Sequence, residues 1–371
     1  MLSRRGLLFS SAALLGCRAR KATGYPGYCF VANEQGQSLA VVDLSTFQTW
    51  HPIALPARPT AVLAHPRRPK IFALAAETGT VFEIDVASLA ISRHTRAGNQ
   101  AASMRLDPGG EALWVLFREP GALIEFPLDT LRPRRRIPLP SPPDTFDLSR
   151  DHQAAIASQS ARTVTIASLD RAAAERTVEL NAEPGILSFQ QKGAQIVVGS
   201  PSNRSLIMID AATGEVLVRL PVPIQPRHFC FSTDDGQLFV TGEGKDAVVI
   251  VYPYNTEVGE TILAGRSPGA MAVVRNFLLL TNPQTNSVTV LDIDNRRLAA
   301  VVGVGQEPRE ILITPDEQYA LVLNQKSGDV AVIRIAALGA RERVRRYKSA
   351  PLFSLIAVGQ KPVSAAVITL S

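Results

Sequence analysis

The chain has 371 residues, of which 46% are hydrophobic and 19% charged, and it contains 25 glycines and 26 prolines. This composition favours a large core with many turns, and the body of the chain has no uncharged apolar run long enough for a membrane-spanning helix. The net charge of +6 falls to about +4 without Arg4 and Arg5. The basic tracts at 132–136 and 341–348 contain a single aromatic residue, Tyr347, and form no aromatic platform, so we expect solvated loops and no nucleic-acid partner.

The N-terminal segment, MLSRRGLLFSSAALLGC, is typical of an export signal, with a charged start followed by a short apolar stretch. Arg4-Arg5 resembles the twin-arginine motif, and Leu14-Leu15-Gly16-Cys17 resembles a lipobox, which implies acylation of Cys17. We therefore predict a signal peptide over 1–16, a tether with a lipidated Cys17 over 17–27, and export to the bacterial cell envelope, in the periplasm or on a membrane. An ordinary cleaved signal with an incidental cysteine is the alternative.

The rest of the chain repeats itself. Apolar runs end at Asp43, Asp85, Asp129, Asp170, Asp210, Tyr252, Asp292 and Arg334, which are 40 to 44 residues apart. Each interval contains four short apolar runs separated by turn sequences such as DPGG and TDDG. A fixed period of this length with four strands in each unit is typical of a β-propeller, in which every sheet is buried against its neighbours.

The two ends of the repeat array predict how the ring closes. The first copy begins at its second strand, Tyr28 to Asn33, and the chain finishes with a surplus opening strand, Ser364 to Leu370. Pairing of these segments would complete one blade and remove the exposed edges. We therefore predict an all-β propeller of eight four-stranded blades over 28–371, with seven blades as the alternative and a basic insertion at about 336–351.

Segments such as FVAN at 30–33, LFVTGEGKDAVVIV at 238–251 and LLLTNPQTNSVTVLDIDNRRLAAVVGVGQEP at 278–308 resemble the YVTN-type β-propeller repeat family. The resemblance covers nearly all of 28–371 and implies a secreted or envelope propeller. Relatives of the same fold class include haem-binding propellers and lactonase propellers. No motif of either group lies in this sequence, so we assign no catalytic residue.

Motifs for cofactors and metals are weak. GEGKDA at 242–247 is followed by a strand and not by the helix that a dinucleotide needs, and DIDN at 292–295 lacks the later ligands of a calcium loop, so we interpret both as turns. Five histidines lie in five separate regions, and we predict no metal. Cys29 and Cys230 lie in apolar strands of distant repeats, so we expect buried free thiols.

Charged residues precede the predicted innermost strands, whose starts converge at one mouth of the central channel. These candidates are Arg58, Asp144, Glu183, Arg227, His228, Arg266, Glu307, Arg309 and Lys361. A ring of guanidinium groups could bind carboxylates or phosphates. The acidic members could instead neutralise their neighbours in a structural salt-bridge network. His228 is either a titrating group or a buried, satisfied histidine.

These observations leave three functions open. The first is a non-enzymatic, monomeric envelope lipoprotein that binds an envelope protein, a glycan or a small anionic ligand at the channel mouth, without a cofactor. The second is an enzyme or cofactor-handling propeller that acts on a haem-type tetrapyrrole or a lactone at the same mouth. The third is a structural module of an envelope complex that docks through the insertion containing 341–348.

Overall fold

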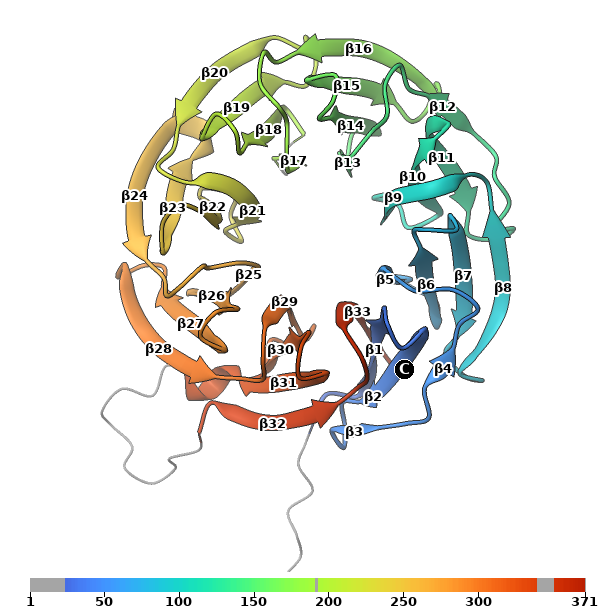
Figure 1. Ribbon diagram of the computed structural model, residues 1–371, viewed down its shortest axis with the longest axis vertical. Coiled ribbons are helices and arrows are strands. Elements are labelled where there is room, and N and C mark those ends of the chain that lie inside the picture. The colour runs from blue at the N-terminus through green and yellow to red at the C-terminus, as the bar shows by residue number, and fades with distance from the viewer. Residues whose placement is uncertain (1–23, 191–192, 339–349, 371) are drawn as a thin grey trace, which may run out of the picture.

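The computed structural model describes residues 24–190, 193–338 and 350–370. These residues form eight antiparallel sheets arranged around a central channel (Figure 1). Cys17 and the basic segment 341–348 lie outside the described residues, so the predictions made for them stay predictions. The fold is the eight-bladed β-propeller that the sequence repeats predict.

Each blade has four strand positions, counted outward from the channel. The innermost strands are β5 (Ala61–Ala64), β9 (Asn99–Leu106), β13 (Thr145–Leu148), β17 (Leu187–Phe189), β21 (Gln225–Phe231), β25 (Met271–Val274), β29 (Pro308–Ile313) and β33 (Pro362–Thr369). The second strands are β1 (Gly27–Asn33), β6 (Lys70–Ala75), β10 (Ala112–Glu119), β14 (Gln153–Ser158), β18 (Gln195–Ser200), β22 (Leu238–Glu243), β26 (Phe277–Asn282) and β30 (Tyr319–Asn324).

The third strands are β2 (Ser38–Asp43), β7 (Thr80–Asp85), β11 (Gly121–Pro127), β15 (Thr163–Ser168), β19 (Ser205–Asp210), β23 (Ala247–Tyr252), β27 (Ser287–Asp292) and β31 (Asp329–Arg334). The outermost strands are β3 (Gln48–Thr49) with β4 (Ile53–Ala54), β8 (Ala90–Arg96), β12 (Arg136–Pro138), β16 (Ala173–Glu179), β20 (Val216–Pro221), β24 (Glu257–Leu263), β28 (Arg297–Gly303) and β32 (Leu352–Ala357). We number the blades 1 to 8 by the chain order of their second strands.

Blade 1 closes the ring. Its innermost strand is β33, from the C-terminal end of the chain, which pairs antiparallel with β1. The register aligns Phe30 with Ala366 and Val31 with Ala365. This confirms the predicted pairing of the two ends, and it covers the inner edge of β1 with a fourth strand.

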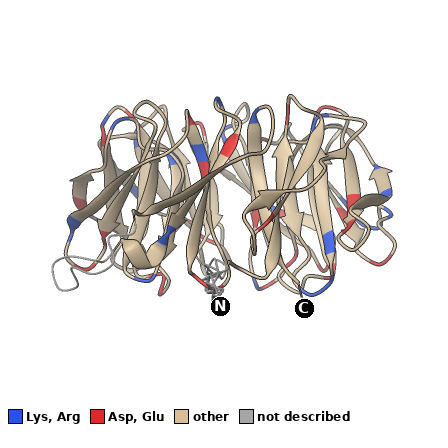
Figure 2. Cartoon of the chain, turned by 90° about the horizontal axis from the view of Figure 1, so that it is seen from below, with Lys and Arg blue, Asp and Glu red and all other residues tan. Residues whose placement is uncertain are grey.

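The core lies between the blades. The middle strands are buried on both faces, so their sequences are continuous apolar runs such as AVVIV at the start of β23. The outermost strands alternate between partly buried and exposed residues, as β8 and β20 do, because only one face packs inward. Lys, Arg, Asp and Glu residues are therefore found mainly in the loops at the two faces of the ring and on its rim (Figure 2).

The described residues contain two short 3₁₀ helices, η1 (Pro253–Asn255) and η2 (Ile335–Ala337), and neither is long enough to cross a membrane. Both cysteines of the described residues are free thiols. Cys29 is buried as expected, whereas Cys230 is only partly buried on the innermost strand β21. Burial raises the pKa of Cys29 to about 12 and that of Cys230 to about 11, so both stay protonated at neutral pH.

Candidate functional site

β-Bulges place two arginines at the channel mouth. In β21, Pro226 pairs with Gly242 and His228 with Thr241, so Arg227 is an extra residue without a partner on β22. The same bulge lies in β29, where Arg309 is the extra residue between Pro308 and Glu310. A bulge turns the extra side chain away from the regular face of the sheet. The two Pro-Arg dipeptides therefore occupy the same place in their blades, with the arginine at the bulge.

Gly242 is needed beside the first bulge. A Cβ atom on Gly242 would lie 1.8 Å from the carbonyl oxygen of Gln225, where the two strands approach each other closely. Glycine is the residue type that removes this clash without moving the backbone. GEGKDA is thus part of a blade hairpin between β22 and β23, as the sequence predicts, and DIDN is likewise a turn, in which the Asp292 carboxylate accepts hydrogen bonds from Asn295.

The two arginines meet in one cavity of about 150 Å³ between blades 6, 7 and 8. We call this the arginine cavity. Its lining comprises Arg227, His228, Gly242, Glu243, Ser267, Pro268, Gly269, Ala270, Thr281, Pro283 and Arg309. Two neighbouring cavities continue along the same mouth: one of about 390 Å³ contains Glu307 and Arg309, and one of about 590 Å³ contains Glu307 and Lys361.

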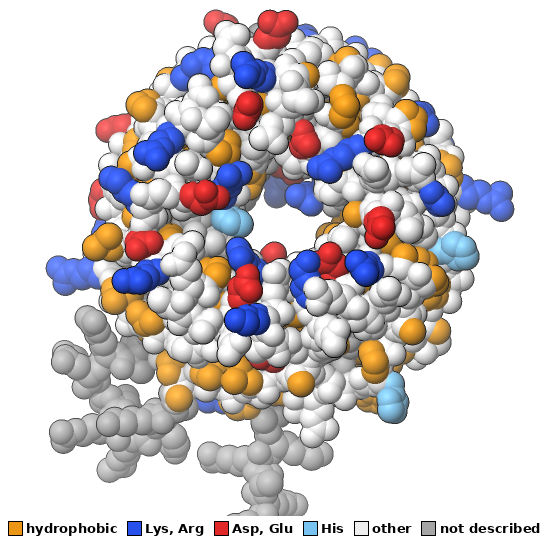
Figure 3. Space-filling view, in the orientation of Figure 1, with side chains coloured by type: hydrophobic (Ala, Val, Ile, Leu, Met, Phe, Trp, Pro, Cys, Tyr) orange, Lys and Arg blue, Asp and Glu red, His pale blue; other side chains and the backbone are white. Residues whose placement is uncertain are grey.

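Ion pairs surround the mouth, where cationic and anionic side chains are interspersed around the open channel (Figure 3). All of these pairs are at least partly exposed to solvent, which limits each to about 1 kcal/mol or less. The pairs that involve predicted residues are Arg118–Asp144 at 3.4 Å, Arg162–Glu183 at 3.9 Å, Arg227–Glu243 at 3.3 Å, Arg309–Glu307 at 2.6 Å and Lys361–Glu34 at 2.6 Å.

The structure thus divides the predicted residues into two groups. Arg227, His228 and Arg309 line a single cavity, and Glu307 and Lys361 line the cavities beside it. The remaining residues lie in other blades or outside these three cavities. They are Arg58, Asp144, Glu183 and Arg266, of which Arg58 and Arg266 are exposed and have no ion pair with a described residue.

The His228 imidazole is held in its neutral form. Desolvation lowers its pKa, and the positive charges of Arg309 and Arg227 lower it further. The ring therefore presents one nitrogen as a hydrogen-bond acceptor or ligand and the other as an N–H donor at neutral pH. Among the described residues, no group of three or more His, Cys, Asp and Glu residues is placed to hold a metal ion.

The residues that follow the bulges line the channel wall. His228 and Glu310 occupy this position in blades 6 and 8, and Ser364 occupies it in blade 1. The Ser364 Oγ accepts a hydrogen bond of 3.2 Å from the Val62 N–H on the innermost strand of the next blade. Side chains at this position therefore lie against the neighbouring innermost strand, beside the open channel.

Sequence reasoning missed Glu310. Desolvation raises the pKa of its carboxyl to about 7, and the positive charge of Arg105, on β9, offsets only part of this increase. Glu310 has no hydrogen bond or ion pair with any described residue. The signal that could have identified it is the parallel between Pro226-Arg227-His228 and Pro308-Arg309-Glu310, two equivalent tripeptides that end in titratable residues.

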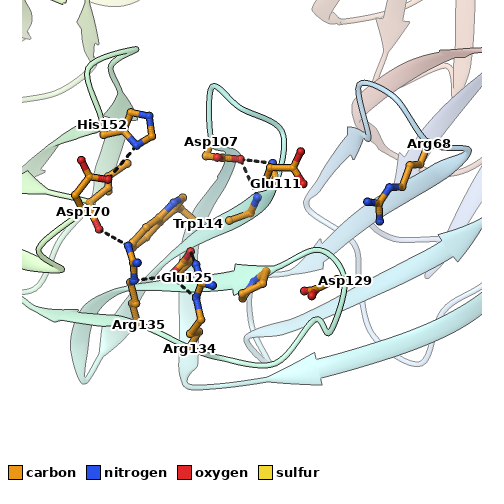
Figure 4. A pocket seen from close by; sticks show the side chains of 13 residues that line it. Arg68, Asp107, Glu111, Trp114, Glu125, Asp129, Arg134, Arg135, His152 and Asp170 are labelled. Atoms are coloured by element: carbon orange, nitrogen blue, oxygen red, sulfur yellow. Dashed lines mark hydrogen bonds and ion pairs between the residues drawn. The ribbon is translucent and has the colours of Figure 1, made fainter.

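A different cavity, of about 420 Å³, lies between turns of blades 2, 3 and 4 that do not line the arginine cavity (Figure 4). Arg134 donates a hydrogen bond of 2.5 Å to the buried Glu125 carboxylate, and Arg135 lies 3.5 Å from it. The sequence suggested that the tract at 132–136 is a solvated loop, but two of its arginines contact a buried carboxylate. These two arginines neutralise a carboxylate that would otherwise be buried without a counterion.

The fold and the mouth define a β-propeller with an open central channel. A family model described as "Lactonase, 7-bladed beta-propeller" matches residues 218–351, about a third of the chain. The present ring has eight blades. No curated protein matches the chain in sequence.

The solved structures that are similar in fold include the following three. Dihydro-heme d1 dehydrogenase NirN in complex with DHE has a TM-score of 0.76 at 13% identity, over 95% of this chain and 77% of that one. Kuenenia stuttgartiensis hydrazine synthase has a TM-score of 0.58 at 17% identity, over 88% and 99%. A functionally unknown protein from Desulfotomaculum acetoxidans has a TM-score of 0.62 at 12% identity, over 93% and 99%. At these identities the likeness concerns the fold alone.

Proposed function

We propose that the protein binds a small anionic molecule, such as a carboxylate, in the arginine cavity. The observation that carries this proposal is the convergence of two bulge arginines and a neutral histidine on one cavity. A guanidinium group can donate two parallel hydrogen bonds to a carboxylate. The Arg227–Glu243 and Arg309–Glu307 pairs are exposed, so a ligand carboxylate can replace the protein carboxylates at small energetic cost.

Calorimetric titration with succinate tests this function. Wild-type protein should bind succinate, and the double variant Arg227→Gln/Arg309→Gln should bind it at least about tenfold more weakly, since two charge-assisted contacts are lost. The matched control is Arg58→Gln/Arg266→Gln, which removes two exposed mouth-side arginines outside the cavity. Equal affinity in the two double variants, or no binding by the wild type, would reject the proposal.

Handling of a tetrapyrrole cofactor is the second candidate. His228 favours it, because a neutral imidazole is the form that ligates iron and the flanking guanidinium groups match the carboxylates of a tetrapyrrole. The fold likeness to NirN in complex with DHE also supports it. Titration with haemin should then give a red-shifted Soret band that is absent from His228→Ala. An assay of γ-lactone hydrolysis by the wild type and by His228→Ala tests the activity named in the matched family model.

We propose further that the protein is an exported envelope lipoprotein of the YVTN-type repeat class. The support is the signal-like segment that ends at Cys17, together with the repeat sequences. In a bacterial host that exports the protein, wild type should incorporate labelled palmitate and its processing should be blocked by globomycin. Cys17→Ser should show neither effect, and a wild-type protein without label would reject the lipid anchor.

A further inference from the structure

The inner wall of the channel contains a charge without a counterion. Most positions equivalent to Glu310 hold small or apolar residues, which suit a wall that packs against the next blade. In the other blades these residues are Ala61, Ser103, Thr145, Ile186, His228, Ala270 and Ser364. Glu310 is the carboxylate of this set, and it is only partly buried because it lies beside the channel.

The positive charge that lowers the Glu310 pKa is already engaged. Arg105 lies on β9 in blade 3, three blades from Glu310 around the ring, so its effect on the Glu310 carboxyl acts across the channel. Its guanidinium also lies 4.0 Å from the Asp147 carboxylate on the neighbouring strand β13. Asp147 is in turn fixed by hydrogen bonds from Ser188 Oγ at 3.0 Å and from the Phe189 N–H at 2.9 Å. Arg105 is therefore shared and does not neutralise Glu310.

The strands packed against β29 do not supply a partner either. β25, β26 and β33 contain no Asp, Glu, His, Lys or Arg, and β30 contains one titratable residue, Tyr319, at the end opposite to Leu323, which pairs with Glu310. At the mouth beside these strands, Arg309 pairs with Glu307 and Lys361 pairs with Glu34, and the His228 imidazole is neutral. The Glu310 carboxylate is therefore free to accept a donor from the channel.

We infer that the channel wall between blades 8 and 1 is a binding subsite for a protonated primary amine, with the Glu310 carboxylate as its counterion. An ammonium group brings three N–H donors and one positive charge, which matches a carboxylate without a partner. This subsite goes beyond the proposed anion binding, because Glu310 does not line the arginine cavity.

Titration with n-butylamine, monitored by NMR of protein labelled at the glutamate side-chain carboxyl carbons, tests the subsite. The probe stays protonated from pH 5.5 to 8.5, whereas Glu310 ionises near pH 7. Affinity should therefore rise about 30-fold over that interval, because the ionised fraction rises from about 3% to about 97%. The Glu310 resonance should shift on binding, and its pKa should fall.

Glu310→Gln should abolish both the binding and its pH dependence. The matched control, Glu317→Gln, removes an exposed carboxylate of the same blade that pairs with Arg275 and should bind the amine as wild type does. Circular dichroism of each variant verifies folding. Equal binding by Glu310→Gln, no binding by the wild type, or an affinity that falls as pH rises would overturn the inference.

Succinate titrations of the same samples report on the arginine cavity independently. Glu310→Gln should leave succinate affinity within about twofold, and Arg227→Gln/Arg309→Gln should leave amine affinity within the same range. A protein that binds n-butylamine but not succinate would retain the Glu310 subsite and reject the proposed anion binding. The reverse result would reject the subsite alone.

Discussion

Two glutamates of this propeller, Glu83 in blade 2 and Glu310 in blade 8, are both enclosed by the fold and differ in every other respect. Glu83 lies on the third strand β7, where its carboxylate is 3.5 Å from Lys70 Nζ, accepts a hydrogen bond of 2.7 Å from Ser92 Oγ and also pairs with Arg93. Desolvation raises its pKa, but these partners outweigh desolvation and the net pKa is lowered. Glu310 is also desolvated, but it has no such partners, so its pKa is raised to about 7.

The difference separates structural charges from candidate functional ones. A buried carboxylate with its own Arg, Lys and Ser is part of the blade, and Glu125 with Arg134 repeats this arrangement in blade 3. A carboxylate without partners beside an open channel destabilises the fold when ionised, and binding of a cationic group offsets that penalty. Variants that remove a partner of one carboxylate, or the other carboxylate itself, test this division.

Removal of Arg93, the arginine that pairs with Glu83, should have the largest effect on stability. Arg93→Ala should lower the free energy of unfolding by about 3 kcal/mol or more, because it leaves Glu83 buried without its main counterion. The same guanidinium also donates hydrogen bonds to the Asp129 and Leu128 carbonyls of blade 3, at 2.6 and 2.9 Å. Urea unfolding at pH 7 measures the change. Arg275→Ala, which breaks an exposed pair, is the control and should cost less than about 1 kcal/mol.

Replacement of Glu310 should raise the free energy of unfolding, and the size of this increase should depend on pH. Because its pKa is about 7 in the folded state and about 4.5 in the unfolded chain, the folded state retains a proton that the unfolded state has lost. Stability therefore falls as pH rises from about 4.5 to about 7, by about 3 kcal/mol in total. Glu310→Gln should match wild type near pH 4.5 and exceed it by up to that amount at pH 8. Coincident unfolding curves for the two proteins at pH 8 would contradict this expectation.

The blades could be predicted from the sequence, because their cause is local. A period of 40 to 44 residues and continuous apolar runs follow directly from four-stranded sheets buried on both faces, and the surplus strand at Ser364 to Leu370 identifies the closure. The position of Arg227 and Arg309 at the start of innermost strands was also predictable, since both follow a proline there. Their shared bulge was not, because it depends on the register with the second strand.

For a related reason, the sequence does not reveal that Glu125 has a counterion and that Glu310 lacks one. Whether a carboxylate is neutralised depends on side chains from other strands and other blades, such as Arg134 for Glu125 and Arg105, across the channel, for Glu310. No spacing in the chain encodes these distances. Arg58, Asp144 and Arg266 each precede an innermost strand but lie outside the arginine cavity, because position before an innermost strand does not determine which neighbours share a cavity.

The exposed pairs of the mouth should contribute little to stability and should compete with ligand. Glu243→Gln should change the free energy of unfolding by less than about 1 kcal/mol, since the Arg227–Glu243 pair is solvent-exposed. The same variant should strengthen succinate binding by about two- to fivefold, because Arg227 loses its competing carboxylate. A tenfold loss of succinate affinity would show instead that Glu243 orients Arg227 for the ligand. Calorimetry and urea unfolding on one preparation give both values.

The smallest expected effect concerns His228, which is enclosed like Glu310 but is stable in its uncharged form. Desolvation, Arg309 and Arg227 all lower its pKa, so removal of one positive charge should raise the pKa towards the ordinary value of about 6.5. Arg309→Gln should therefore raise the His228 pKa measured by NMR titration, whereas Arg266→Gln, outside the cavity, should leave it unchanged. Since desolvation is the largest cause, the pKa should remain below the ordinary value even in Arg309→Gln. Full recovery in that variant would mean that charge, and not burial, holds the imidazole neutral at the mouth.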